Sequence, residues 1–216
     1  MFIRYAALTL AFIPTLAVAA DTTFSQNPFT DVPTKHVNYD AIEYLRKNNV
    51  LKGYADGSFK PEARINRAEL VKLIANPFIL DVDRINQCIP EHVKDNTHVF
   101  FNDVLKTDWF APEVCMARVK SIVSGYPDGT FKPGSYTSFV EAAKILSGVF
   151  SLQVNEVPGD EQWYKPYVEK LASLKAIPLT IGGLSATVTR GEVAEMLYRL
   201  KADVATKSSK TASQLR

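Results

Sequence analysis

The sequence predicts a mainly α-helical protein built from three helix–loop–helix units. A nine-residue segment at positions 53–61 recurs 72 residues later, at positions 125–133, with seven identical residues. A helix-start signal recurs at the equivalent place in all three units, and apolar residues follow it at helical spacing. One unit is too small to enclose a core alone. We therefore expect each unit to contribute two main helices and to bury its apolar faces against the other units.

The repeat extends beyond this segment. The 72-residue offset holds without gaps from Phe29 to Lys72, and it pairs Asp31 with Asp103 and Glu69 with Glu141. A third copy is degraded: residues 163–168 resemble residues 109–114, and residues 188–193 resemble residues 65–70. Between these landmarks the third copy is three residues shorter and lacks the glycine-rich loop. The expected organisation is a signal peptide (1–20), a first repeat (28–76), an insertion (77–99), a second repeat (100–150), a degenerate third repeat (158–201) and a basic tail (202–216).

The N-terminal segment has the pattern of a secretory signal peptide. Arg4 precedes an apolar run at 5–18, and small residues at 17–20 offer a cleavage site. The run is short for a membrane-spanning helix. We therefore expect an exported protein and leave this segment out of the fold. The tail from about residue 202 has few apolar residues and is predicted to be disordered.

Each unit reads as helix, turn and helix. In the first, Ile42, Leu45 and Val50 have near-helical spacing, and the Asp-Gly pair at 56–57 predicts a turn, as does the pair at 128–129. A small polar residue followed by Glu three positions later predicts a capping box at the start of each second helix. The three pairs are Asn66 with Glu69, Ser138 with Glu141, and Thr189 with Glu192.

Charge and motif content argue against two function classes. After the signal peptide the chain carries 24 basic and 23 acidic side chains, without the basic excess typical of nucleic-acid-binding proteins. No nucleophile elbow, zinc-protease helix or phosphate loop occurs, so we expect no enzyme and no cofactor. A carboxylate pair for glycoside hydrolysis stays open, because spatial pairing is not visible in a sequence.

The two cysteines are expected to form a disulfide. An exported chain with an even cysteine count favours a bridge between Cys88 and Cys115. A zinc site made by Cys88, His92 and His98 is the alternative, but a fourth ligand is not evident. We therefore predict no metal site.

The ordered set of motifs resembles the S-layer homology repeat. The family's marks occur here as an opening Phe-x-Asp-Val at 29–32, an aromatic pair at 109–110, Gly-Tyr-x-Asp-Gly loops at 53–57 and 125–129, and helix openings at 66–69 and 189–192. The resemblance covers most of residues 28–201. It implies a pseudo-threefold helical module that holds exported proteins non-covalently on bacterial cell-wall polysaccharides, often pyruvylated ones, in grooves between repeats.

The chain departs from the family pattern at three places. Phe139 stands where the second repeat should carry Arg, the third repeat lacks the glycine loop, and Val37 replaces the aromatic that the second repeat supplies as Trp109. At most two Arg-bearing half-sites remain. We expect the Arg67 site to include the intact Gly53 loop and the Arg190 site to have an altered wall.

Arg67 and Arg190 are the main candidates for ligand binding. Each opens a helix, where unpaired amides and the helix dipole favour an anion, and a guanidinium there can hold a carboxylate through two parallel hydrogen bonds. A pyruvate ketal on a sugar offers such a carboxylate. The alternative is an ion pair that joins adjacent repeats.

The remaining candidates have structural alternatives. Gly53 and Gly125 would allow close approach of a sugar or provide the positive-φ stop of the first helix. Asp31 and Asp103 would accept sugar hydroxyls or, preferably, cap a local turn. Ring stacking on a sugar is the ligand hypothesis for Trp109 and Trp163, although aromatics at the start of a core helix usually pack inward.

Two functions from different classes follow. The first is an anchor that binds acidic cell-wall polysaccharide at the cell surface. The second is an envelope or protein-interaction module that kept the fold without the sugar site, which Phe139 favours because an apolar residue at a groove mouth suits a protein or apolar partner. Nucleic acid and, after signal cleavage, membrane are not expected as partners.

Overall fold

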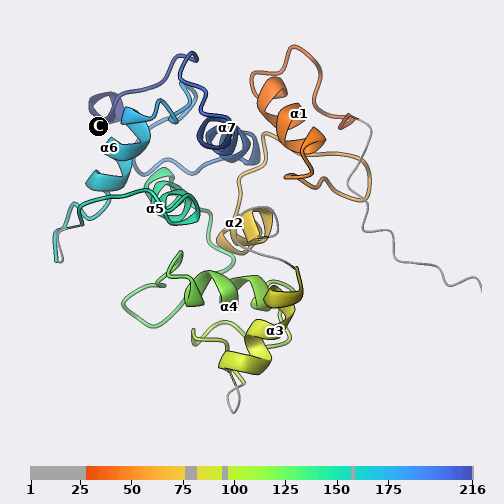
Figure 1. The fold of residues 1–216 in the computed structure, drawn as a ribbon, viewed down its shortest axis with the longest axis vertical. Helices are drawn as coiled ribbons and strands as arrows, with labels where there is room; N and C mark the ends of the chain where they lie inside the picture. Colours follow the sequence, from red (N-terminus) through yellow and green to blue (C-terminus); the bar gives the residue numbers. More distant parts are fainter. Residues whose placement is uncertain (1–27, 76–81, 94–96, 157–158, 216) are drawn as a thin grey trace, which may run out of the picture.

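The computed structural model describes residues 28–75, 82–93, 97–156 and 159–215, and within them it is mainly α-helical, as predicted (Figure 1). The predicted signal peptide lies outside these residues. In the described part of the chain, β-structure is limited to isolated bridges. The helices are α1 (Tyr39–Lys47), α2 (Arg67–Ile74), α3 (Val82–His92), α4 (Ala111–Val119), α5 (Phe139–Val149), α6 (Lys165–Ser173), α7 (Arg190–Lys201) and the 3-10 helix η2 (Ala212–Leu215). Helices α3 and η2 were not expected from the sequence.

A closed ring of three backbone hydrogen bonds marks the pseudo-threefold axis. The amide of Ile65 donates to Val188 (3.1 Å), that of Val188 to Thr137 (2.9 Å), and that of Thr137 back to Ile65 (3.0 Å). These residues occupy the same position in the three units. All three are fully buried, so the ring lies inside the core. Buried backbone groups need hydrogen-bond partners, and here the carbonyl of one repeat accepts from the amide of the next.

Each lobe of the molecule combines helices from two repeats (Figure 1). Helix α4 packs against α2, α6 against α5, and α1 against α7. The first helix of one repeat therefore covers the second helix of the preceding repeat around the ring. This arrangement buries apolar faces that no single repeat could cover, and it places the walls of each inter-repeat groove on different repeats.

The first helix of every unit ends in the same way. Asn49, Ser121 and Lys175 adopt positive φ values of 56°, 58° and 53°. In the first unit, the amides of Asn49 and Val50 donate to the carbonyls of Arg46 (2.9 Å) and Leu45 (2.7 Å), which is the Schellman pattern. The same pair of bonds recurs at the equivalent positions of the other two units. The helix stop is therefore not Gly53 or Gly125, which removes one of the two roles considered for those glycines.

The second helices start as the sequence predicts. All three capping boxes are present, with the side chains of Asn66, Ser138 and Thr189 accepting from the amides of Glu69, Glu141 and Glu192. Each Glu side chain in turn accepts from the amide of the capping residue. Such caps typically contribute about 1 kcal/mol each to stability.

Helix α3, from the insertion, is bound covalently to the second repeat. The predicted disulfide joins Cys88 of α3 to Cys115 of α4, with a Cα–Cα distance of 6.1 Å. The zinc alternative is therefore wrong, because Cys88 is not a thiolate. Within the described ranges no group of three His, Cys, Asp or Glu side chains is placed to hold a metal ion.

The prediction of a disordered tail is wrong for residues 202–215. Leu215 is 1% exposed and belongs to the core, and its carbonyl accepts from the amide of Leu184 (3.1 Å). Lys207 forms an ion pair with Glu195 of α7 (2.9 Å). Composition alone failed here because the tail is held mainly by polar contacts and backbone hydrogen bonds. No helix in the described part of the chain is long and apolar enough to span a bilayer.

Candidate functional site: two inter-repeat grooves

Two grooves at equivalent places bring together residues from all three repeats. The first groove has a volume of about 530 Å³ and lies beside the loop of the first repeat. Its lining residues are Val50, Lys52, Gly53, Tyr54, Glu69, Lys72, Leu73, Trp109 and Arg190. The second groove, of about 260 Å³, lies beside the loop of the second repeat. Its lining residues are Arg67, Ile122, Val123, Ser124, Gly125, Tyr126, Pro127, Glu141, Lys144, Ile145 and Trp163.

The structure corrects the expected pairing of arginines and loops. Arg190 of the third repeat lies at the Gly53 loop, where its Nε donates to the carbonyl of Phe59 (2.8 Å). Arg67 of the first repeat lies at the Gly125 loop and donates to the carbonyl of Phe131 (2.8 Å). Ring closure sets each second helix against the loop of the next repeat. Both arginines therefore face an intact glycine loop.

Each guanidinium is held in the same aromatic cradle. The guanidinium carbon of Arg190 lies 4.8 Å from the ring centres of both Tyr54 and Phe59. Arg67 repeats this arrangement at equivalent rings of the second repeat, at 4.8 and 4.9 Å. Both arginine residues are only 6–7% exposed. Backbone and ring contacts thus fix the orientation of two buried cations at the groove walls.

The electrostatic surroundings of the two arginines differ. In the second groove the carboxylate of Glu141 lies 3.5 Å from Nη1 of Arg67 and accepts a short hydrogen bond from the hydroxyl of Tyr126. Burial would raise the pKa of Glu141, but the hydrogen bonds from Tyr126 and Ser138 and the charge of Arg67 outweigh it and lower that pKa. Burial, together with the hydrogen bond to Glu141, raises the pKa of Tyr126 to about 12.

Arg190 lacks such a carboxylate. Among the described residues no Asp or Glu forms an ion pair with it, and burial lowers its pKa below the ordinary arginine value. The first groove is lined by three cations, Lys52, Lys72 and Arg190, against the single carboxylate of Glu69. The second groove is lined by two cations, Arg67 and Lys144, and one carboxylate, that of Glu141. Lys72 is also paired with the buried carboxylate of Glu113. Because Arg190 has no ion-pair partner among the described residues, the first groove is the more favourable of the two for an anion.

The first amides of α2 and α7 already have hydrogen-bond partners, which the sequence hypothesis did not foresee. The first two amides of α2 donate to the carbonyls of Ser135 and Pro133, each at 3.1 Å, and those of α7 donate to Ala63 (2.9 Å) and Pro61 (2.8 Å). The third amide of each helix donates to the side chain of the capping residue. Inter-repeat carbonyls thus occupy the groups that a bound anion would need, so binding depends on side chains.

Trp109 and Trp163 lie at the groove rims. They are 58% and 40% exposed, whereas their neighbours Phe110 and Tyr164 are buried and half-buried and contact the core. The expectation that aromatics at this position pack inward is therefore wrong for the tryptophans. Lys144 Nζ lies 5.5 Å from the ring centre of Trp163. Each groove thus offers an exposed indole, and in the second groove a cation lies close to its ring.

The glycine and aspartate candidates serve the loop itself. A Cβ on Gly53 or Gly125 would come within 2.4 Å of the ring of Phe29 or Phe101, so both glycines are required by packing as well as lining the grooves.

The carboxylates of Asp31 and Asp103 cap the loop, which is the role that the sequence analysis preferred for them. The two oxygens of Asp31 accept from the amides of Phe59 (2.8 Å) and Lys60 (2.7 Å), and those of Asp103 accept from the equivalent amides. Asp56 and Asp128 are turn residues, as predicted, each accepting from the amide two residues later.

At the third inter-repeat position, the described residues do not repeat this constellation. Phe139 is fully buried rather than exposed at a groove mouth, and Val37, which replaces the tryptophan, is 64% exposed. These two departures and the missing glycine loop belong to the same position around the ring. The sequence differences therefore fall together in one place and leave the other two grooves complete.

Several groove residues were missed at the level of sequence. Tyr54, Tyr126, Lys72 and Lys144 line the grooves but were not chosen as candidates. The 72-residue offset pairs Tyr54 with Tyr126 and Lys72 with Lys144, and this identity was the signal that could have identified them.

Comparison with known proteins agrees with this architecture. Residues 28–71 and 100–143 match the model of the S-layer homology domain. A cellulosome-anchoring protein of Acetivibrio thermocellus is 25% identical over 190 residues, which is 81% of this chain and 39% of the relative. The S-layer protein sap of Bacillus anthracis is 25% identical over 222 residues (96% of this chain, 25% of the relative). A middle cell wall protein of Brevibacillus brevis is 27% identical over 191 residues (88% and 17%).

The chain spans less than half the length of each of these relatives. The matched family is a structural domain of surface-layer and anchoring proteins rather than a family of enzymes. Family and relatives indicate an exported protein of the cell surface. Two of the three repeats, at residues 28–71 and 100–143, are therefore identified as S-layer homology repeats.

Proposed function

We propose that this protein binds an acidic cell-wall polysaccharide without a covalent bond and so acts as an anchor at the bacterial cell surface. The observation that carries the proposal is the repeated constellation of a buried arginine, a glycine loop, a lysine and an exposed tryptophan. It occurs twice, at equivalent places, and each time it draws on all three repeats. Packing alone does not require an exposed indole at the rim of each groove.

The chemistry of each groove fits a charged sugar. The indole of Trp109 or Trp163 offers an apolar face on which a sugar ring can stack. The Nε of each arginine is taken up by a carbonyl, and in Arg190 the Nη groups make no hydrogen bond to any other described residue. Those groups suit a carboxylate, such as that of a pyruvate ketal, through charge-assisted hydrogen bonds. Lys72 or Lys144 lies in the same groove, paired with Glu113 or Glu156 respectively.

The alternative, a module that binds only proteins, loses its main support. It rested on an apolar residue at a groove mouth, but Phe139 is fully buried. The anchoring role is also the one named for the relative from Acetivibrio thermocellus. We propose that the chain is not catalytic and that the wall polysaccharide is its principal partner.

The experiment that tests this function is co-sedimentation of the purified chain with sacculi from its own organism. The sacculi would be used intact and after removal of the wall-linked polysaccharide. Anchoring predicts that the chain sediments with intact sacculi and stays in solution with stripped ones. Equal binding to both preparations, or binding to neither, would contradict a polysaccharide anchor.

A further inference from the structure

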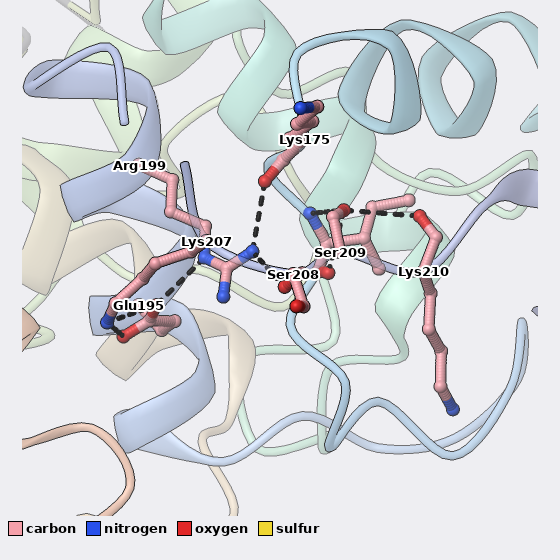
Figure 2. Close-up of polar contacts among 8 residues, drawn as sticks. Lys175, Glu195, Arg199, Lys207, Ser208, Ser209 and Lys210 are labelled. Atoms are coloured by element: carbon pink, nitrogen blue, oxygen red, sulfur yellow. Dashed lines mark hydrogen bonds and ion pairs between the residues drawn. The ribbon is translucent and has the colours of Figure 1, made fainter. Parts of the chain in front are cut away.

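The third inter-repeat position is occupied by the chain itself. Residues Lys207–Lys210, here called the tail segment, lie between α7 and the stretch that follows α6 (Figure 2). The hydroxyl of Ser209 donates to the carbonyl of Ile177 (3.0 Å) and accepts from its amide (3.3 Å), and the amide of Lys210 also donates to that carbonyl (3.1 Å). Arg199 donates to the carbonyls of Lys175 (3.0 Å) and Ser208 (2.9 Å).

The residues that hold the tail segment correspond to the walls of the two grooves. Counting from the shared helix ends and capping boxes, Ile177 occupies the position of Val123, and Glu195 occupies the position of Lys72 and Lys144. Val123 and both lysines line grooves. The tail segment therefore lies beside residues that are equivalent to wall residues of the other two grooves.

The charge of this third position is inverted. Lys72 and Lys144 are replaced by Glu195, and the groove arginine is replaced by Phe139. Glu195 is only 2% exposed. Its carboxylate accepts a hydrogen bond from Nε of Arg199 (2.8 Å), and both of its oxygens accept from Nζ of Lys207 (2.9 and 3.2 Å), as Figure 2 shows. A buried carboxylate at this place disfavours a polyanion and favours a cationic segment.

We propose that the third position is a binding groove for a basic, extended peptide, and that the tail segment is its ligand in cis. The backbone of Ile177 binds the Lys210 amide and the Ser209 hydroxyl. Glu195 binds the lysine at position 207, and Arg199 binds the carbonyl of Ser208. This site differs from the polysaccharide grooves in place and in charge, and the proposal does not depend on polysaccharide binding.

The test separates the tail from the rest of the folded protein. A protease recognition sequence inserted between the exposed residues Ala205 and Thr206 allows cleavage after folding. Once the cut peptide has been removed, a fluorescent peptide of residues 206–215 is expected to bind the cut protein at a ratio of one to one in fluorescence anisotropy. It should not bind the uncut chain. A Lys207→Met peptide should bind about tenfold more weakly, because it keeps the apolar stem and loses the ion pair.

Cut protein that keeps its circular dichroism spectrum and fails to bind the peptide would overturn the proposal, as would equal binding to cut and uncut chains. If the cut protein unfolds, hydrogen exchange of the Lys210 amide in the uncut chain tests the proposal instead. The Lys210 amide should be protected in the wild type and should exchange about tenfold faster in Lys207→Met, but not in Lys35→Met, which removes an exposed charge from the first repeat. An unprotected Lys210 amide, or equal exchange in both variants, would contradict the proposed groove.

Discussion

Arg190 and Phe59 are joined by a 2.8 Å hydrogen bond that crosses from the third repeat to the first. The bond fixes the guanidinium at the wall of the first groove and also helps to close the ring of repeats. Arg67 and Phe131 form the equivalent bond between the first and second repeats. In the structure, therefore, the residues proposed to bind a ligand also join the repeats, so binding and stability must be measured separately.

The two arginines should contribute unequally to binding. Arg190→Ala is expected to weaken binding to intact sacculi by about 10–100-fold, because it removes a cation with no carboxylate partner among the described residues. Arg67→Ala should weaken it less, since Glu141 already partly neutralises that guanidinium.

The matched control for these variants is Arg118→Ala, at an exposed arginine outside both grooves. Thermal unfolding of each variant identifies any loss that is due to folding. A larger loss for Arg67→Ala than for Arg190→Ala, at equal folded fractions, would contradict the assignment of the first groove as the stronger anion site.

The loop glycines should be sensitive to a single methyl group. Gly125→Ala places a Cβ within 2.4 Å of Phe101 at a φ of +74°, and Gly53→Ala meets both Phe29 and the carbonyl of Ser58. Each change should lower the free energy of unfolding by about 1–3 kcal/mol, as overpacking does in well-packed cores. Urea denaturation measures the effect.

Gly134→Ala is the control for the glycine variants, because a Cβ there meets no atom within 4 Å. It should change the free energy of unfolding by less than about 0.5 kcal/mol. A similar loss in all three variants would show that the close approach to the phenylalanine rings is not the cause.

Acid should weaken the second groove. Because the pKa of Glu141 is lower in the folded chain than its ordinary value of 4.5, its contribution to stability is present above that value and is lost as the pH falls through the lowered one. The free energy of unfolding of the wild type should therefore decrease more between about pH 5 and pH 3 than that of Glu141→Gln. An exposed carboxylate variant, Glu161→Gln, should follow the wild type. Parallel pH profiles for wild type and Glu141→Gln would be inconsistent with this role.

The disulfide should stabilise the protein without contributing to either groove. Replacing both Cys88 and Cys115 by Ala is expected to lower the free energy of unfolding by about 2–4 kcal/mol, mainly because the unfolded chain gains freedom. Under conditions where the variant stays folded, binding to sacculi should be unchanged, since neither cysteine lines a groove. A selective loss of binding would indicate that α3 supports the ligand site.

Local features of the fold could be predicted from the sequence. Capping boxes at Asn66, Ser138 and Thr189 depend on residues three positions apart, and the turns at Asp56 and Asp128 depend on residues two positions apart. Such contacts are determined by the local chain, so a repeat visible in the sequence is repeated in the structure. The helix stops at Asn49 and Ser121 were missed because neither is a glycine.

Features that depend on ring closure could not be predicted. The sequence places Arg67 beside the Gly53 loop, but the structure places it at the Gly125 loop of the next repeat. The exposure of the groove tryptophans and the burial of Phe139 follow from the same rotation between repeats. The tail was misjudged for a related reason: its partners, Glu195 and Ile177, come from separate segments of the third repeat.

The most direct test of the polysaccharide anchor uses the tryptophans, because both are exposed and neither ring belongs to the core. The double variant Trp109→Ala, Trp163→Ala should keep the wild-type unfolding temperature and bind intact sacculi at least about tenfold more weakly. Val37→Ala, at the equivalent exposed position of the third groove, should bind like the wild type. Wild-type binding by the double variant, at equal stability, would contradict the claim that these two grooves bind the polysaccharide.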